Sequence, residues 1–348
     1  MKEPKRMELP REVWMGPRVL EKTADVCRRL SLGRHPLIVA DPKTFKIAGK
    51  KIKNSLEKEH FDVHHVMIEK SDMETVNKLR ELIKGKVDFL LGVGGGTCID
   101  VAKFTSYREK IPFISVPTAA SHDGIASSRA SIKGGGKPTS VEAQAPIAII
   151  ADTLIIKRAP HRLLAAGCGD MVANYTAVHD WELAHRLKNE PYSEYAAALS
   201  RMSAKLVMKN AKIIKQHTEE SVRKVVKALI SSGVAMSIAG NSRPASGSEH
   251  LFSHALDMIA PNPALHGEQC GVGAIMMAYL QGGNWEAIRD ALGTIGCPIN
   301  SSELGIEPKY IIKALIKAPE IRPERYTILS EGLNKREAEK LAKETGVI

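Results

Sequence analysis

Short, continuously apolar runs recur in the first 160 residues, with helix-like stretches between them. Five of these runs predict strands, at 36–40, 62–68, 87–93, 112–116 and 146–151. One intervening stretch, 72–84, repeats its apolar residues at helical spacing behind Asp72, a residue type that commonly starts helices. Because runs that are apolar throughout belong to strands covered on both faces, the pattern predicts an α/β domain with a parallel sheet.

The pattern changes near residue 160, where helical spacing replaces the apolar runs. Amphipathic stretches separated by Pro, Gly and Asn predict helices at 161–187, 192–217, 218–239, 247–259 and 268–281. The sequence therefore predicts two domains, an α/β domain over 1–160 and a helical domain over 161–348. Within the first of these, the glycine triplet 134–136 predicts a hairpin or a loop tip.

Composition restricts the class of protein. Of the 348 residues, 43% are hydrophobic, which is enough for packed cores and excludes a disordered chain. Five cysteines are too few for a disulfide framework, and their odd number fits a reducing compartment, so we expect a cytoplasmic protein. The first residues lack the apolar segment of a signal peptide, and the sequence has no spanning run, so we expect no membrane insertion.

The charge balance is basic, since 50 Lys and Arg against 39 Asp and Glu give a formal net charge of +11. Such a surplus admits a nucleic-acid partner, but no zinc finger, basic arm or RNA-binding aromatic motif accompanies it. Part of the surplus follows one face of a predicted helix, at Arg201, Lys205, Lys209 and Lys212. We interpret this face as solvated and the opposite one, with Met202, Leu206 and Ile213, as buried, and we expect no nucleic-acid partner.

A glycine-rich turn joins the predicted strand 87–93 to the helix that follows it. The turn and the start of the helix comprise Gly94, Gly95, Gly96, Thr97, Cys98, Ile99 and Asp100. Glycines there let backbone amides approach a pyrophosphate, and the first turn of a helix offers unpaired N–H groups to the anion. The turn therefore indicates a phosphate-bearing cofactor, although Thr97 stands where the dinucleotide-binding fingerprint has its third glycine. A glycine turn that serves only close packing is the alternative.

A second loop, of small and polar residues, follows the predicted strand 112–116. It lies at the carboxyl edge of the predicted sheet, where open α/β folds bind ligands. Asp123 and Ser127 become candidate ligand-contacting residues, although Ser and Asp are also ordinary turn residues. Asp41 follows the strand 36–40, a place from which an acidic group can contact an adenine ribose, and it does not exclude NADPH.

The helical half carries a carboxylate and several imidazoles. Asp170 lies in one predicted helix, His250 and His254 lie four residues apart on one face of another, and His266 follows a proline-rich loop. One carboxylate with two or three imidazoles suits a divalent cation such as Zn²⁺ and leaves a position open for a substrate oxygen. Each residue alone also fits a structural role, such as a helix cap for Asp170. The cysteines show no C-x-x-C spacing, which argues against a cysteine-based zinc site.

Five segments together resemble the iron-containing alcohol dehydrogenase and glycerol dehydrogenase superfamily, in the order GGGTCID, PTAASHDGIAS, GCGDMVAN, SGSEHLFSHALD and LHGEQCGVG. Within it they are most similar to the archaeal-type sn-glycerol-1-phosphate dehydrogenase branch, over about residues 10 to 340. The resemblance implies an N-terminal Rossmann-like parallel-sheet domain that binds NADPH or NADH. It also implies a C-terminal all-helical, dehydroquinate synthase-like domain that holds one catalytic Zn²⁺ per subunit.

The resemblance also implies roles for individual positions. Asp170, His250 and His266 match metal ligands, while Asp123, Asp170 and His254 match catalytic and substrate-contacting positions. Asn174 stands where iron-dependent members carry an additional histidine ligand, which favours zinc. The positions that match cofactor-binding segments are Gly94, Gly95, Gly96, Thr97, Cys98, Ile99, Asp100, Thr118, Ala119, Ala120, Ser121 and Ser127.

The activity implied by the resemblance is reduction of dihydroxyacetone phosphate to sn-glycerol 1-phosphate, the glycerophosphate backbone of archaeal membrane lipids, by a homo-oligomer. The metal would polarise the ketone oxygen, and His254 or a water at the metal would supply the proton. The substrate phosphate needs a cationic or amide-rich pocket. Arg243, just before the predicted helix 247–259, is a candidate for it, and an exposed surface arginine is the alternative.

Two other enzyme classes share this scaffold. A glycerol dehydrogenase would act on an unphosphorylated polyol, and a measured preference for such a substrate would favour that branch. A dehydroquinate synthase-like lyase also uses NAD and a metal, but its multiply charged substrate calls for a denser lining of Lys, Arg and His than this chain shows.

Overall fold

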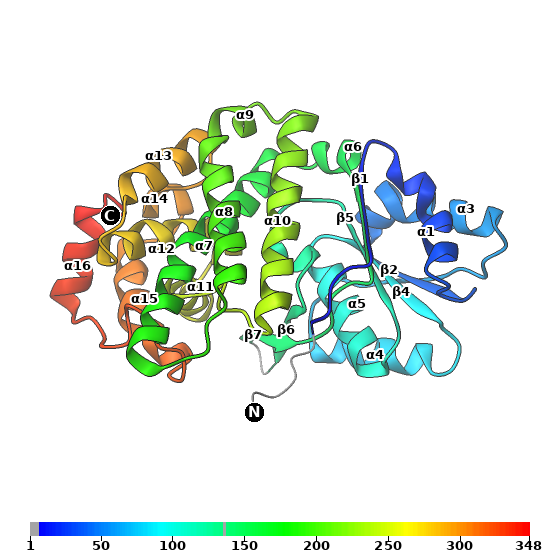
Figure 1. The fold of residues 1–348 in the computed structure, drawn as a ribbon, viewed down its shortest axis with the longest axis horizontal. Coiled ribbons are helices and arrows are strands. Elements are labelled where there is room, and N and C mark those ends of the chain that lie inside the picture. Colours follow the sequence, from blue (N-terminus) through cyan, green and yellow to red (C-terminus); the bar gives the residue numbers. More distant parts are fainter. Residues whose placement is uncertain (1–6, 135–136) are drawn as a thin grey trace. The chain divides into compact units, whose positions relative to one another are not determined.

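A computed structural model describes residues 7–134 and 137–348 of the chain (Figure 1). The chain forms two compact units. The first contains the described residues up to Ala120 together with Gly124–Pro160, and the second contains Ser121–Asp123 and His161–Ile348. Asp123 therefore belongs to the second unit, although its position in the sequence falls within the range predicted for the first domain.

A six-stranded sheet forms the centre of the first unit. Its strand order is β1-β8-β5-β4-β2-β3, and every neighbouring pair is parallel. The strands are β1 (Glu12–Gly16), β2 (Pro36–Ala40), β3 (His64–Met67), β4 (Phe89–Gly94), β5 (Phe113–Pro117) and β8 (Ala148–Asp152). The predicted parallel α/β fold is confirmed, and five of these strands lie within two residues of their predicted bounds.

The strand that the sequence did not predict, β1, lies at one edge of the sheet. The four central strands are buried at every position, so they produce continuous apolar runs. In β1, by contrast, Val13 is 45% exposed and only Gly16 is buried. A strand with one neighbour and a partly solvated face lacks the continuous pattern on which the prediction relied.

Helices and a hairpin complete the first unit. Asp72 caps α4 (Met73–Ile83) as predicted, because its carboxylate accepts a hydrogen bond from the Thr75 N–H at 2.8 Å. The antiparallel strands β6 (Arg129–Gly134) and β7 (Lys137–Glu142) form the hairpin predicted around 134–136, of which 135–136 lie outside the described residues. The helices are η1 (Val19–Lys22), α1 (Thr23–Arg29), α2 (Pro42–Thr44), η2 (Phe45–Gly49), α3 (Lys50–Lys58), α4 (Met73–Ile83), α5 (Gly96–Glu109) and α6 (Thr153–Lys157).

The second unit is helical. Of η3 (Asp123–Ile125), only Asp123 belongs to this unit. The helices of the unit are α7 (His161–Lys188), α8 (Glu194–Lys209), α9 (Ala211–Lys215), α10 (Glu219–Ala239), α11 (Ser248–Ile259), α12 (His266–Leu280), α13 (Trp285–Ile295), α14 (Ser301–Leu304), α15 (Pro308–Ile321) and α16 (Lys335–Glu344). The predicted stretch 192–217 is two helices, because Asn210 ends α8 and turns its side chain back to the Leu206 carbonyl at 2.7 Å. No helix in the described part of the chain is long and apolar enough to span a bilayer.

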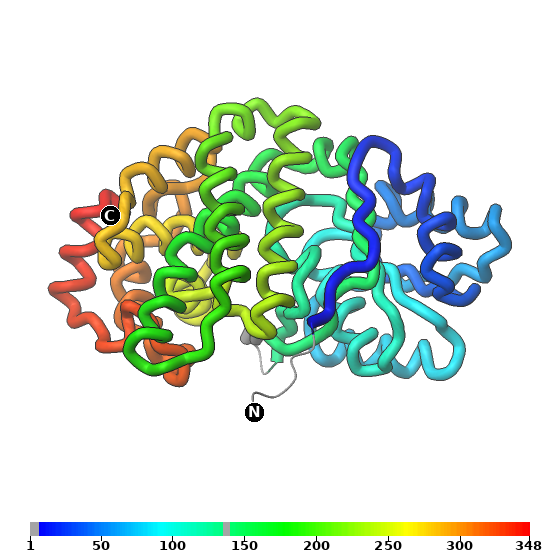
Figure 2. Tube along the Cα trace, viewed as in Figure 1, coloured from blue at the N-terminus to red at the C-terminus, as the bar shows by residue number. Residues whose placement is uncertain are grey.

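Helix α7 is the central helix of this unit and packs against α8, α10, α11 and α12 (Figure 2). Because neighbours surround it, its polar residues Asp170, Asn174, Thr176 and Asp180 are buried as well as its apolar ones. Buried polar groups require partners. We therefore expect polar partners around these four side chains.

The predicted burial of one face of 201–213 is partly wrong. Lys205 and Lys209 are exposed as expected, but Met202 and Leu206 are also exposed, at 52% and 50%. The face of α8 that packs inward carries the small residues Ala196, Ala197, Ser200, Ser203, Ala204 and Val207. Small residues allow α8 to approach α7 and α10 closely, so the larger apolar side chains are left outside.

Candidate functional site

Helices α7 and α12 meet backbone to backbone in the second unit. A Cβ added at Gly169 would lie 2.1 Å from the Gly267 carbonyl oxygen, and one added at Gly267 would lie 1.9 Å from the Ala166 carbonyl oxygen. Neither position can hold a side chain without moving a helix. This close crossing places Asp170 of α7 beside His266, the first residue of α12.

His250 of α11 completes a carboxylate–imidazole group, and a cysteine joins it. The Nε2 atoms of His250 and His266 lie 3.5 Å and 3.9 Å from Oδ1 of Asp170. Cys270, one turn after His266 on α12, places its Sγ 3.5 Å from His266 Nε2. The ligand atoms of these four residues all lie within 4.8 Å of one another, an arrangement that can hold a metal ion. The structure thus brings the three predicted ligands together and adds a thiol that the sequence argued against.

Burial and mutual charge set the protonation of this group. Burial raises the pKa of Asp170, but its pairing with His250 and the hydrogen bond from the Asp123 N–H act in the opposite direction, and this pKa is lowered. Burial and the charge of His250 lower the pKa of His266 to about 3, while burial raises the pKa of the Cys270 thiol to about 11. An ionised carboxylate beside a neutral imidazole is the donor set of a divalent cation.

Polar groups behind the two imidazoles fix the rings. Oε1 of the fully buried Glu249 lies 2.9 Å from His250 Nδ1 and also accepts the Gly247 N–H at 2.6 Å. Ser253 Oγ lies 3.2 Å from His266 Nδ1. With Nδ1 of each ring engaged, Nε2 is the atom left to bind a metal.

His254 adjoins the group from the next turn of α11. Its ring stacks on that of His266, with the centroids 5.6 Å apart, and its Nδ1 lies 3.8 Å from the Asp257 carboxylate. Burial lowers the pKa of His254, although the pairing with Asp257 acts in the opposite direction. The predicted proton donor therefore lies beside a candidate metal ligand.

Asp123 touches the group through its backbone. Its N–H donates to Oδ2 of Asp170 at 2.9 Å, and its own carboxylate accepts a hydrogen bond from the Ser232 hydroxyl at 2.9 Å. Asn174 donates in turn to Ser232 Oγ at 3.0 Å. Sequence analysis did not identify Ser232, because a serine in the middle of α10 carries no signal of its own. Asn174 thus supports Asp123 indirectly, through the hydroxyl of Ser232.

Arg243 is not available to a phosphate, which corrects the expectation from the sequence. Its guanidinium forms a bidentate ion pair with Glu190, in which Nε donates to Oε1 at 2.7 Å, and Nη1 donates to the Tyr326 carbonyl at 2.8 Å. The residue is only 3% exposed, so the surface alternative is wrong too. Arg243 is a buried residue that ties the loop before α11 to its surroundings.

In the first unit, the glycine-rich turn connects β4 to α5, with Gly95 as the N-cap of the helix. A Cβ at Gly94, where φ is 157°, would lie 2.7 Å from Cys98 Sγ, whereas a Cβ at Gly95 would meet nothing within 4 Å. Close packing therefore explains Gly94. The open space over Gly95, at the N-terminus of a fourteen-residue helix, leaves room for an anion.

Other residues of the predicted cofactor segments are buried in α5, the helix that begins at this turn. Ile99 is fully buried, and the Asp100 carboxylate lies 3.5 Å from Nζ of the fully buried Lys103. Lys103 also donates to the carbonyls of Gly124 and Arg129, at 2.6 Å each. Asp100 and Lys103 thus fix the loop that follows β5 relative to α5.

The remaining predicted residues lie near the carboxyl ends of three neighbouring strands, β2, β4 and β5. The Thr118 N–H, after β5, donates to the Gly94 carbonyl at 3.0 Å. Asp41, after β2, caps α2, and its Oδ2 lies 3.6 Å from Cys98 Sγ. Ala119, Ala120 and Ser127 are buried in the same unit, while Ser121 belongs to the second unit. The Asp41 carboxylate thus lies beside the glycine-rich turn.

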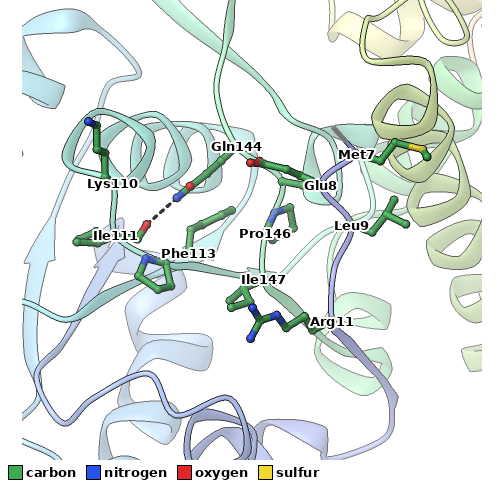
Figure 3. A pocket seen from close by; sticks show the side chains of 12 residues that line it. Met7, Glu8, Leu9, Arg11, Lys110, Ile111, Phe113, Gln144, Pro146 and Ile147 are labelled. Atoms are coloured by element: carbon green, nitrogen blue, oxygen red, sulfur yellow. Dashed lines mark hydrogen bonds between the residues drawn. The ribbon is translucent and has the colours of Figure 1, made fainter. Parts of the chain in front are cut away.

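A hollow of about 370 Å³ opens at the opposite end of the sheet (Figure 3). It lies where β1, β5 and β8 begin, and Arg11, Lys110, Phe113 and Gln144 contribute to its wall. Gln144 donates to the Ile111 carbonyl at 2.7 Å there. None of the predicted cofactor residues lines this hollow, so it is separate from the candidate cofactor site.

A solved structure and a sequence profile identify the fold. The profile described as iron-containing alcohol dehydrogenase matches residues 14–160. The structure superposes on glycerol dehydrogenase from Schizosaccharomyces pombe with a TM-score of 0.84 and 21% identity, over 99% of this chain and 91% of that one. The chain therefore has the fold of the iron-containing alcohol dehydrogenase class.

Curated relatives resolve the family within that class. The chain is 62% identical to glycerol-1-phosphate dehydrogenase (NAD(P)+) of Thermococcus sibiricus over 98% of both chains. It is 61% identical to the protein of the same name from Methanosarcina mazei, over 99% of this chain and 97% of that one. The chain belongs to the glycerol-1-phosphate dehydrogenase family.

Proposed function

We propose that this chain is an oxidoreductase that reduces dihydroxyacetone phosphate to sn-glycerol 1-phosphate with NADPH or NADH and one Zn²⁺ per subunit. The observation that carries the proposal is the group of Asp170, His250 and His266 with Asp123 and His254 around it, in a chain 62% identical to a glycerol-1-phosphate dehydrogenase. The product would supply the glycerophosphate backbone of membrane lipids.

The donor set fits a divalent cation held by Asp170, His250 and His266. Oδ2 of Asp170 accepts a hydrogen bond from the Asp123 N–H, whereas Oδ1 faces the Nε2 atoms of both imidazoles. Oδ1 is therefore the oxygen that would bind the cation. When bound, the cation supplies Lewis-acid polarisation of the ketone oxygen, and the nicotinamide supplies the hydride. Glu249 and Ser253 hold the orientation of the two imidazoles through their Nδ1 atoms.

Asp123 and His254 act on the substrate in this proposal. The Asp123 carboxylate, oriented by Ser232, accepts a hydrogen bond from a substrate hydroxyl. His254 donates the proton that turns the reduced carbonyl oxygen into a hydroxyl, and Asp257 orients its ring. The reaction then balances, because one hydride reaches the carbon and one proton reaches the oxygen.

The cofactor would bind at the carboxyl edge of the sheet. The turn from Gly94 to Cys98 receives the pyrophosphate at the N-terminus of α5, with Ile99 and Asp100 supporting it from inside. Thr118 to Ser121 and Ser127 line the cofactor on the side of β5. Asp41 contacts the adenine ribose on the side of β2.

The substrate phosphate requires a cation, and we propose Arg322 in place of Arg243. Arg322 follows α15, which packs against α11, the helix that carries His254. Its half-buried guanidinium makes neither a hydrogen bond nor an ion pair with any other described residue. Burial lowers the pKa of His254, and the positive charge of Arg322 lowers it further, which agrees with a position near the site. A free guanidinium matches the geometry of a phosphate.

The experiment that tests the proposed function compares phosphorylated with unphosphorylated substrate. Purified protein is assayed with NADPH and with NADH on dihydroxyacetone phosphate and on dihydroxyacetone, and the chirality of the product is determined. We expect the phosphate ester to be strongly preferred and the product to be sn-glycerol 1-phosphate. A preference for the unphosphorylated ketone would instead support a glycerol dehydrogenase.

We further propose a homo-oligomer that works in the cytoplasm. Tyr195, Met202 and Leu206 lie at helical spacing on α8 and are 85%, 52% and 50% exposed, an apolar surface that a second copy could cover. Light scattering on a Met202→Lys, Leu206→Lys double variant tests this, and an unchanged mass would exclude the surface as the interface. The five cysteines are free and buried, which suits a reducing compartment.

A further inference from the structure

We propose that Ser232 is a positioning residue for Asp123 and that this pair selects ketones with a hydroxyl group at the unphosphorylated end. The proposal rests on the proposed function and deepens it, because it names the part of the substrate that Asp123 recognises. Its basis is a chain of hydrogen bonds within the second unit, which runs from Asn174 through Ser232 and Asp123 to Asp170.

The chain links α7, α10 and the segment Ser121–Asp123. Asn174 of α7 donates from Nδ2 to Oγ of Ser232 in α10 at 3.0 Å, and Ser232 donates to Oδ2 of Asp123 at 2.9 Å. Both Asn174 and Ser232 are fully buried. Because Asn174 stands one helical turn after Asp170, their side chains lie on the same face of α7. The chain therefore adjoins the candidate metal group, and the Asp123 N–H completes it at Asp170 Oδ2 at 2.9 Å.

The types of donor and acceptor along the chain fix the direction of its hydrogen bonds. A serine hydroxyl has one proton, and an asparagine side chain donates only from its nitrogen. With Nδ2 of Asn174 directed to Ser232, the single proton of that hydroxyl goes to Asp123. The reverse amide orientation would set two acceptors, Asn174 Oδ1 and the Asp123 carboxylate, against this one proton. Asn174 therefore keeps Ser232 as a donor, and Ser232 keeps Asp123 as an acceptor.

A carboxylate that is held as an acceptor recognises a substrate group that donates. In dihydroxyacetone phosphate this group is the terminal hydroxyl, because the ketone oxygen and the phosphate dianion are acceptors. The carboxylate also repels the phosphate end, which has the same sign of charge. The backbone of Asp123 is bonded to Asp170 at the same time, so the hydroxyl is recognised at a defined place beside the metal group.

Two phosphate esters test this selection. The full-length enzyme is assayed on dihydroxyacetone phosphate and on hydroxyacetone phosphate, in which a methyl group replaces the hydroxymethyl group. A site built to bind a hydroxyl rejects an analogue that lacks it, so we expect the wild-type kcat/KM to be at least about 100-fold higher with the first ester.

Variants of the chain should change the ratio of these two kcat/KM values. Ser232→Ala should lower it by about tenfold, because Asp123 loses the donor that orients it, while kcat/KM for hydroxyacetone phosphate should change little. Asn174→Ala should lower the ratio by a smaller factor, because it acts through Ser232. Ser237→Ala is the matched control and should leave the ratio unchanged. Ser237 is a buried serine of the same helix, and its Oγ has no hydrogen-bond partner among the described residues.

The possible outcomes separate this inference from the proposed function. A wild-type enzyme that reduces both esters equally well overturns the selection, whether or not the variants fold. Equal losses on the two esters in Ser232→Ala, or an unchanged ratio, overturn the positioning role of Ser232, and Asn174→Ala decides the same question if Ser232→Ala does not fold. A protein that reduces dihydroxyacetone but neither ester refutes the proposed function, and the ratio for dihydroxyacetone against hydroxyacetone then tests Ser232. A protein that reduces none of these ketones overturns both proposals.

Discussion

The backbone N–H of Asp123 donates a hydrogen bond to Oδ2 of Asp170 at 2.9 Å, while Oδ1 of the same carboxylate faces the imidazoles of His250 and His266. Each oxygen of Asp170 thus has a separate task. The residue proposed to contact substrate is joined to the metal group through its backbone, and its side chain is directed to Ser232. A substitution at Asp123 can therefore change the substrate contact without removing the support of Asp170.

Replacement of Asp123 by Ala should lower activity and leave metal content unchanged. The variant keeps the N–H that supports Asp170 and loses only the carboxylate. A hydrogen bond to a charged group contributes about 1.5–3 kcal/mol, so we expect kcat/KM to fall by about 10- to 150-fold. Steady-state kinetics with metal analysis of the same preparation checks this, and loss of the metal in Asp123→Ala would refute the division of tasks.

Metal content should respond differently to His266→Ala and Asn174→Ala. His266 presents Nε2 3.9 Å from Asp170 Oδ1, whereas the Asn174 amide is bonded to Ser232. We expect His266→Ala to lose the ion and Asn174→Ala to lower its affinity by no more than the roughly 10- to 100-fold typical of a supporting residue. Elemental analysis after dialysis against a weak chelator measures both. The reverse ranking would show that the ligands are assigned wrongly.

Arg322→Gln should weaken discrimination between dihydroxyacetone phosphate and dihydroxyacetone. If the guanidinium binds the phosphate, only the ester loses an interaction, and the ratio of the two kcat/KM values should fall by about 10- to 150-fold. Arg336→Gln, an exposed arginine of α16, is the control and should leave the ratio unchanged. Equal losses on both substrates would assign Arg322 to the protein's own structure instead.

The stability of the second unit should depend on pH through Asp180. Burial and the charge of Glu249 raise the pKa of the Asp180 carboxyl from 3.8 to about 6. The folded state thus binds the proton more tightly than the unfolded state, so the free energy of unfolding falls as pH rises from 3.8 to about 6. The change amounts to about 3 kcal/mol and is complete above the folded pKa.

Asp180→Asn provides the measurement. An amide still accepts the Ser248 N–H but does not titrate, so chemical denaturation should show a smaller pH dependence in the variant than in the wild type between pH 4 and 6. The comparison is made on metal-free protein because the metal group has its own pH dependence. Identical pH profiles for the two proteins would rule out Asp180 as the titrating group.

The sequence predicted the central strands better than it predicted how the candidate site residues lie relative to one another. Strands β2, β4, β5 and β8 are buried on both faces, and continuous burial leaves a pattern in the sequence. The distance from Asp170 to His266 depends instead on the contact of Gly169 with Gly267, which no periodicity reveals. The residue types alone could therefore suggest a cation site, but not which of these side chains lie together.

Arg243 shows why sequence reasoning failed at a particular position. A guanidinium just before a predicted helix suggested a phosphate contact, but Glu190, more than fifty residues away in the sequence, forms a bidentate ion pair with it. A contact between residues so far apart leaves no pattern in the local sequence.

Gly95→Ala should weaken cofactor binding without destabilising the fold. A Cβ at Gly95 would meet no protein atom within 4 Å, and its backbone lies in the ordinary extended region, so the unfolding free energy should change little. The same Cβ would occupy the space into which a pyrophosphate must fit at the start of α5. We expect the Kd for NADPH, measured by fluorescence titration, to rise about tenfold or more, equivalent to about 1.4 kcal/mol.

Gly94→Ala is the contrasting variant, because its Cβ would lie 2.7 Å from Cys98 Sγ and should lower stability as well. Unchanged NADPH binding in Gly95→Ala would place the pyrophosphate away from this turn.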